Sequence, residues 1–147
     1  MALGIRHGGR RYDVRTVDAL KATLLGVRSI VYAKEGAGGL YFADLAARLG
    51  LADALNAKTT YAANGEEVAR TVARGAADIG VQPLSEILPH ADLEVLATFP
   101  PSVEGYAVMV GAVAAAGGRA AAARQLLAFL VSPPTLPVLA QKGMTRQ

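Results

Sequence analysis

Short runs of β-branched and aromatic residues alternate along this chain with segments whose apolar residues have helical spacing. Glycine stands at most of the boundaries between the two kinds of segment. The runs that predict buried strands are 30–32, 59–62 and 79–82. Between the first two, residues 40–49 place apolar side chains at helical spacing and stop at Gly50. Parallel strands need a long crossover, usually a helix, and this alternation supplies one. The sequence therefore predicts an α/β fold in which helices cover a mostly parallel sheet.

Capping residues and glycines locate the ends of the predicted elements. Thr16 and Asn64 are N-cap residues with acidic first turns, and Gly26 and Gly75 stand at helix ends. We expect strands at 2–5, 28–32, 59–62, 79–82, 93–97 and 106–113. We expect helices at 16–26, 40–49, 52–55, 64–75, 119–131 and 134–142.

The composition excludes several classes of protein. With 147 residues, the chain is one domain of ordinary size or one lobe of a larger protein. Its 52% hydrophobic and 18% charged residues exclude intrinsic disorder, and its apolar stretches are too short to span a bilayer. Without cysteine, and with His7 and His90 far apart, no metal site is expected, and no cofactor either. A net charge of +3 with 5% aromatic residues disfavours nucleic acid as a partner.

Three places combine the end of a predicted strand with the start of a helix, where ligands bind in open α/β sheets. The first is the glycine-dense segment 33–39, with Ala37, Gly38 and Gly39. Backbone N–H groups at a helix start are unpaired donors, and glycines let an anion approach them. The alternative is a tight turn whose glycines only permit positive φ. The spacing matches neither a dinucleotide fingerprint nor a P-loop.

The other two places are Asn64-Gly65, at the next helix start, and Gln82, after the third strand. A second helix start aimed at the same point would strengthen an anion site, although capping alone explains Asn64. The Gln82 amide can donate to a bound anion, or it can be a capping or solvent-facing residue. Together the three places predict a site for a small anion.

Candidates for catalysis are few. Glu35, Glu86, Asp78 and His90 are the groups from which an acid–base pair could be assembled. Asp78, at a strand start, is expected to face solvent, and His90 is expected on the surface. Nothing in this set requires an enzyme.

Beyond single motifs, a series of segments resembles the molybdate-binding branch of the type II periplasmic solute-binding proteins. The resemblance runs in order over nearly the whole chain, at 16–32, 38–42, 64–68, 75, 78–82, 85–89, 127–132 and 142–144. It implies a three-layer α/β/α lobe. Proteins of this kind have two lobes joined by hinge strands, with the ligand clamped between them.

The resemblance implies that 14–102 is the second lobe, that 1–8 and 105–113 are hinge strands, and that 118–147 holds C-terminal helices. The first lobe and an export signal are not expected within this chain. By the same resemblance the protein is periplasmic or exported, and it works with the permease of an ABC transporter. The apolar faces of the last two helices need cover, by their own lobe or by self-association into a homo-oligomer.

The resemblance also places ligand contacts on the backbone near Gly38 and Gly65. A tyrosine that molybdate binders use has no counterpart at 82–83, where Gln82 and Pro83 stand. The ligand therefore stays open among molybdate, tungstate, other oxyanions and small carboxylates. Two other functions stay open as well. One is an isomerase of a small carboxylic acid, with Glu35 or Glu86 as the base. The other is the sensing domain of a transcription regulator.

Overall fold

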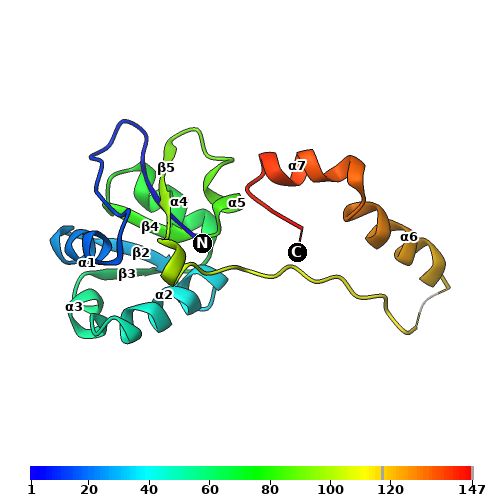
Figure 1. The fold of residues 1–147 in the computed structure, drawn as a ribbon, viewed down its shortest axis with the longest axis horizontal. Coiled ribbons are helices and arrows are strands. Elements are labelled where there is room, and N and C mark those ends of the chain that lie inside the picture. The colour runs from blue at the N-terminus through cyan, green and yellow to red at the C-terminus, as the bar shows by residue number, and fades with distance from the viewer. Residues whose placement is uncertain (117, 147) are drawn as a thin grey trace. The chain divides into compact units, whose positions relative to one another are not determined.

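The computed structural model describes residues 1–116 and 118–146. The chain divides into two compact units, Met1–Ala107 and Val108–Gln147. The first contains a sheet with helices on both faces, and the second contains two helices (Figure 1). Among the described residues, no helix is both long enough and apolar enough to cross a membrane.

The sheet of the first unit is mixed, with most strands running in one direction. Its order is β3-β2-β4-β1-β5. The strands are β1 (Ala2–Arg6), β2 (Ile30–Ala33), β3 (Thr59–Ala62), β4 (Ile79–Gln82) and β5 (Leu93–Thr98). β2 pairs in parallel with β3 and β4, whereas β1 is antiparallel to β4 and β5. Only β1 is therefore reversed, which agrees with the predicted mostly parallel sheet.

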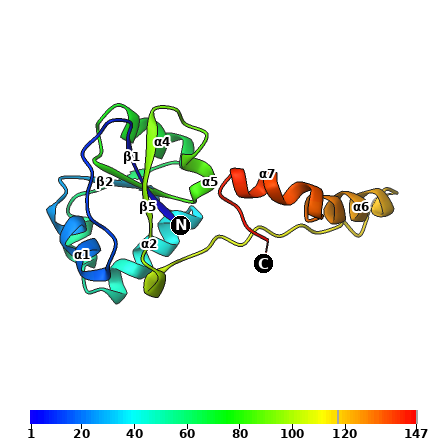
Figure 2. The same cartoon turned by 45° about the horizontal axis from the view of Figure 1, so that its top comes forward.

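Helices cover both faces of this sheet, so the unit has the predicted three layers (Figure 2). They are α1 (Val17–Gly26), α2 (Ala37–Arg48), α3 (Ala52–Asn56), α4 (Gly65–Ala73) and α5 (Leu84–Ile87). Ile30 and Tyr32 of β2 pack with apolar residues of α1, α2 and α3. Val31 packs on the opposite face with residues of α4 and α5. The alternation along β2 thus divides the core into two apolar layers.

The predicted bounds hold well for the strands and less well for the helix that follows β2. β3 and β4 coincide with their predicted ranges. α2 begins at Ala37, three residues before the predicted start, so Gly38 and Gly39 lie in its first turn rather than in a loop. Neither glycine has a positive φ. A Cβ at Gly39 would collide with the Ala33 carbonyl, so close packing against β2 requires this glycine.

Two other features differ from the predictions. The strand expected at 106–113 is not found, and these residues have no regular secondary structure. A strand needs a neighbouring backbone to pair with, and within the described residues this segment has none. The short helix α5 was not predicted, because four residues are too few for a periodic pattern.

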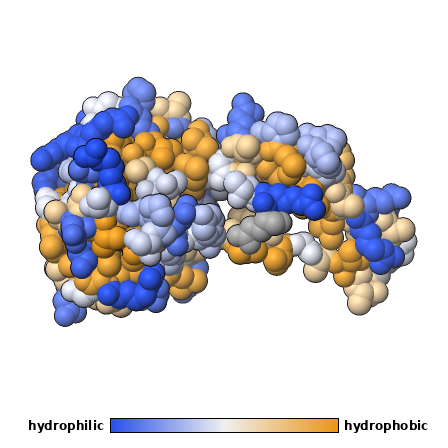
Figure 3. Space-filling view, viewed as in Figure 1, coloured by the Kyte–Doolittle hydropathy of each residue, from blue (hydrophilic) through white to orange (hydrophobic). Residues whose placement is uncertain are grey.

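The second unit consists of α6 (Ala120–Leu130), a 3₁₀ turn (Pro133–Thr135) and α7 (Leu136–Gln141). A further 3₁₀ turn, Pro101–Val103, belongs to the first unit. No described residue of α6 or α7 is buried. Figure 3 shows apolar side chains on the surface of this unit, and Leu126 and Phe129 are both more than half exposed.

Candidate functional site

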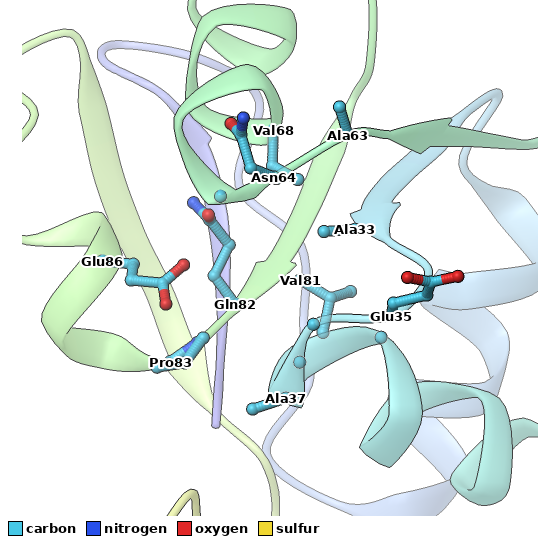
Figure 4. Close-up of a pocket in the computed structure, with 14 residues that line it drawn as sticks. Ala33, Glu35, Ala37, Ala63, Asn64, Val68, Val81, Gln82, Pro83 and Glu86 are labelled. Atoms are coloured by element: carbon cyan, nitrogen blue, oxygen red, sulfur yellow. The ribbon is translucent and has the colours of Figure 1, made fainter. Parts of the chain in front are cut away.

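A cavity of about 280 Å³ lies at the carboxyl ends of β2 and β4 (Figure 4). Its walls come from the β2–α2 turn, from the start of α4 and from the β4–α5 turn. All of the residues predicted to contact a ligand line it: Ala37, Gly38, Gly39, Asn64, Gly65 and Gln82. The structure therefore brings the three predicted places together at one site.

The start of α2 contributes free backbone donors to this cavity. Its N-cap residue is Gly36, which has no side chain to accept a hydrogen bond from the first turn. The first intrahelical hydrogen bond is donated by the Leu40 N–H to the Gly36 carbonyl, at 3.0 Å. The N–H groups of Ala37, Gly38 and Gly39 precede it and have no acceptor within the helix. These N–H groups carry the positive end of the helix dipole.

The start of α4 is capped more completely. As predicted, Asn64 is the N-cap residue, and its side-chain oxygen accepts from the Glu67 N–H at 3.0 Å. Glu66 and Glu67 occupy the first turn. The Glu66 carboxylate pairs with Arg70 at 3.0 Å and lies 3.7 Å from His90 Nε2. This helix start therefore offers fewer open donors than the start of α2.

Gln82 lies between two walls of the cavity, the start of α4 and the β4–α5 turn. It is only 2% exposed, at the last position of β4. With the side-chain amide turned so that its nitrogen faces these two acceptors, Gln82 donates to the Gly65 carbonyl at 2.8 Å and to Glu86 Oε2 at 3.3 Å. These two bonds use both amide hydrogens within the protein. Gln82 thus fixes the start of α4 and the Glu86 side chain relative to β4.

Two carboxylates line the cavity, in different settings. Both residues are exposed, but Glu86 points toward Gln82, whereas Glu35 lies on the opposite side of the cavity (Figure 4). Glu86 Oε2 lies so close to the Gly65 Cα that a Cβ there would collide with it. Although the residue is exposed, partial burial of its carboxyl group raises the pKa of Glu86. Among the described lining residues none is Lys or Arg, and nearby Lys34 lies over the Tyr61 ring, 5.5 Å from its centroid.

Comparison with known proteins identifies the family. The model of the family described as "Bacterial extracellular solute-binding protein" matches residues 1–145. The chain belongs to this family. A protein of similar sequence is the aconitate isomerase of Pseudomonas sp, 29% identical over 145 residues, which are 98% of this chain and 55% of the isomerase.

Two solved structures share the fold of this chain. One is the substrate-binding domain of a molybdenum ABC transporter from Clostridium difficile, with a TM-score of 0.73 and 19% identity, covering 99% of this chain and 63% of that one. The other is the periplasmic molybdate-binding protein of Azotobacter vinelandii, with a TM-score of 0.73 and 21% identity, covering 99% and 65%. The chain thus spans less than two thirds of the length of these relatives.

The remaining acid–base candidates lie away from the cavity. Asp78 was expected to face solvent, and this prediction is wrong: its side chain is 12% exposed. It accepts from the Arg28 guanidinium at 2.6 Å and from the Arg28 N–H at 2.8 Å. Asp78 precedes β4, at the end of that strand opposite Gln82, so it ties β4 to β2 rather than facing a ligand. His90 is 30% exposed and contacts Glu66, as a surface histidine does.

Glu86 is a base candidate from the sequence, but it is not among the predicted ligand contacts. Its position depends on α5, which turns back directly after Pro83 and directs the carboxylate toward Gly65. The only sequence signal was the spacing of four residues between Gln82 and Glu86 across a proline. Among residues 1–116 and 118–146, no three carboxylate or imidazole groups gather as a metal site would require.

Proposed function

We propose that this chain is part of the substrate-binding component of an ABC importer and that its cavity binds a small anion. The ligand would be molybdate, tungstate, another oxyanion or a small carboxylate. The observation that carries the proposal is the cavity itself, where the uncapped start of α2 meets the start of α4. Neutral amides at helix starts bind anions without basic side chains. The family membership supports the same role.

Within this proposal each predicted contact has a specific part. The N–H groups of Ala37, Gly38 and Gly39 would donate to the anion, and the N–H of Gly65 would donate from α4. Asn64 would hold the first turn of α4 in place, and Gln82 would hold Gly65 and Glu86. We expect weak binding by this chain, because these donors approach the ligand from one side.

We further propose the arrangement that the resemblance implies. Residues 14–102 form one lobe, 1–8 and 105–113 act as hinge segments, and 118–147 supply C-terminal helices. The partner is the permease of the transporter, and the site of action is outside the cytoplasm, as the family description indicates for its members. The exposed apolar face of α6 would be covered by self-association.

The anion site is tested by titrating the ¹⁵N-labelled chain with molybdate, tungstate, sulfate and citrate. We expect at least one anion to shift the amide resonances of Ala37, Gly38, Gly39 and Gly65 in a saturable way. Shifts confined to the arginine-rich segment 6–15 would instead indicate non-specific attraction and would contradict the proposal. Tight stoichiometric binding measured by calorimetry would contradict the expectation of weak binding.

A second function, isomerisation of a small carboxylic acid, has one structural observation in its favour. The Glu86 carboxyl, with its raised pKa, faces the cavity, as a general base or acid would. The similarity to an aconitate isomerase adds to this. Turnover of aconitate that disappears in Glu86→Gln, while amide shifts on ligand addition persist, would favour the enzyme over the transporter component.

A further inference from the structure

Glu86 is an unexpected neighbour for a bound anion. Its Oε2 lies against the Gly65 Cα and accepts from the Gln82 amide at 3.3 Å. It therefore occupies the wall of the cavity beside the start of α4, where the proposed anion would also lie. The other carboxylate, Glu35, is directed away from this wall (Figure 4).

The charged groups around Glu86 do not neutralise it. On α4, Glu66 is paired with Arg70 and lies near His90 beyond α5, and Glu67 is exposed. β1 and β5 also pack against α5. Their ionisable residues are the exposed Arg6 and the half-buried Glu94, and Glu94 is paired with Arg11 at 2.8 Å. Among the described residues, no Lys, Arg or His pairs with Glu86. An anion that enters therefore meets an uncompensated carboxylate.

Two anionic oxygens make a stable short contact only when a proton lies between them. That proton comes either from the ligand or from the carboxyl group. Glu86 is exposed as a residue, but partial burial of its carboxyl group raises its pKa, and a bound anion would raise it further through like-charge repulsion. An anion that carries a proton can donate a hydrogen bond to the Glu86 carboxylate. An anion without a proton can bind beside Glu86 only if the carboxylate takes up a proton from solvent.

We propose that Glu86 determines the ligand class of this cavity by selecting anions that bring a hydrogen-bond donor, such as a protonated oxyanion or a hydroxy acid, over fully deprotonated oxyanions. This inference rests on the proposed function of the cavity as an anion site. The start of α2 supplies donors for the anionic oxygens, and Glu86 supplies an acceptor for the ligand's O–H. A site that combines these donors with this acceptor disfavours a ligand of the same shape that has no O–H group. The Glu86 carboxylate would then face an anionic oxygen with no proton between them.

The test compares two tetrahedral anions of similar size. Hydrogen phosphate carries a proton at neutral pH, and sulfate does not. Each is titrated into the ¹⁵N-labelled chain at constant ionic strength, and the amide shifts of Gly38 and Gly65 are followed. We expect hydrogen phosphate to bind about tenfold more tightly than sulfate. We also expect sulfate affinity to increase as the pH is lowered through the raised pKa of Glu86.

Glu86→Gln keeps the shape of the side chain and removes its charge. We expect this variant to lose the preference for hydrogen phosphate and to lose the pH dependence of sulfate binding. Glu67→Gln makes the same charge change in the first turn of α4, outside the cavity lining, and should keep both. The amide spectrum without anion reports whether each variant is folded.

The outcomes separate the two proposals. If neither anion shifts these amides, the anion site itself is contradicted, and the inference with it. If both anions bind equally to the unmodified chain, or if Glu67→Gln and Glu86→Gln have equal effects, the anion site stands and selection by Glu86 is contradicted. Should Glu86→Gln not fold, equal binding of the two anions by the unmodified chain would still overturn the inference.

Discussion

Gly39 lies where the first turn of α2 packs against the end of β2, and its lack of a side chain is a packing requirement. A Cβ there would collide with the Ala33 carbonyl and come within 2.9 Å of the Tyr32 ring. Gly38 is similar, since its Cβ would lie 3.0 Å from Gln82 Cα. These contacts bring the uncapped amides of α2 close to the end of β4. The same residues thus serve both packing and the proposed site.

Replacing Gly39 by alanine should destabilise the protein. The neighbouring atoms belong to the backbone and to a buried ring, so the added methyl group has no room, and we expect a loss of about 1–3 kcal/mol. Gly26→Ala is the control, because nothing lies within 4 Å of its Cβ position; we expect a gain of about 0.5 kcal/mol there. Urea denaturation of both variants measures the difference. Equal stability of the two variants would show that α2 does not pack as described.

The Asp78 carboxylate accepts two hydrogen bonds from Arg28 and so ties β4 to β2. Burial alone would raise its pKa, but the hydrogen bonds from the Arg28 side chain and backbone outweigh burial, and the pKa is lowered from 3.8. A lowered pKa in the folded state stabilises the protein above the unfolded-state value. This contribution is lost as the pH falls through the folded-state value.

We therefore expect Asp78→Asn to lower the free energy of unfolding at neutral pH by about 1–3 kcal/mol. The difference from the unmodified chain should shrink as the pH falls below 3.8. Asp44→Asn is the control, because Asp44 forms an exposed pair with Arg48 and such pairs contribute at most about 1 kcal/mol. A difference at Asp78 that did not change with pH would contradict the role of its charge.

At the scale of the elements, the two helix starts at the cavity are built differently, and they should respond differently to mutation. The start of α2 has a glycine cap, whereas α4 depends on the Asn64 side chain. Aspartate is as good an N-cap as asparagine, but it places a negative charge at the edge of the cavity.

We expect Asn64→Ala to lower the free energy of unfolding by about 1 kcal/mol and Asn64→Asp to leave it nearly unchanged. Asn64→Asp should nevertheless weaken anion binding, because its carboxylate repels the ligand. Thermal unfolding and anion titration of both variants separate the two effects. Unchanged anion affinity in Asn64→Asp would place the ligand away from α4.

The sequence predicted those elements whose position depends on the local pattern of residues. β3 and β4 are short runs bounded by turn residues, so their ranges were predictable. The convergence of Gly38, Gly65 and Gln82 followed from the rule for open α/β sheets. The segment 106–113 was not predictable in the same way, because its apolar residues do not reveal whether a partner strand lies beside it. The position of Glu86 in the cavity wall was not predictable either, because it depends on how α5 turns back after Pro83.

At the scale of the whole molecule, the two units differ in how they bury apolar surface. The first unit has a core on both faces of its sheet, whereas α6 leaves Leu126 and Phe129 exposed by 57% and 58%. Exposed apolar surface of this kind favours association. The second unit is therefore the part of the chain that most needs a partner surface.

We expect the sedimentation coefficient to rise with protein concentration, because α6 associates with a second copy of the chain. Replacing Leu126 and Phe129 together by glutamate should abolish the rise. Arg124→Ala, an exposed change on the same helix, should not. A monomer at every concentration would exclude self-association and leave cover by the chain's own first unit as the alternative.

The most direct test of the central claim, an anion held between the starts of α2 and α4, is a crystal structure of the chain soaked in arsenate. Arsenic scatters anomalously, and arsenate keeps a proton at neutral pH, as the proposed selection by Glu86 requires. We predict an anomalous peak in the cavity, within hydrogen-bonding reach of the amides of Gly38 and Gly65 and of the Glu86 carboxyl. Arsenate found only on the arginine-rich segment 6–15, with the cavity empty, would contradict the claim.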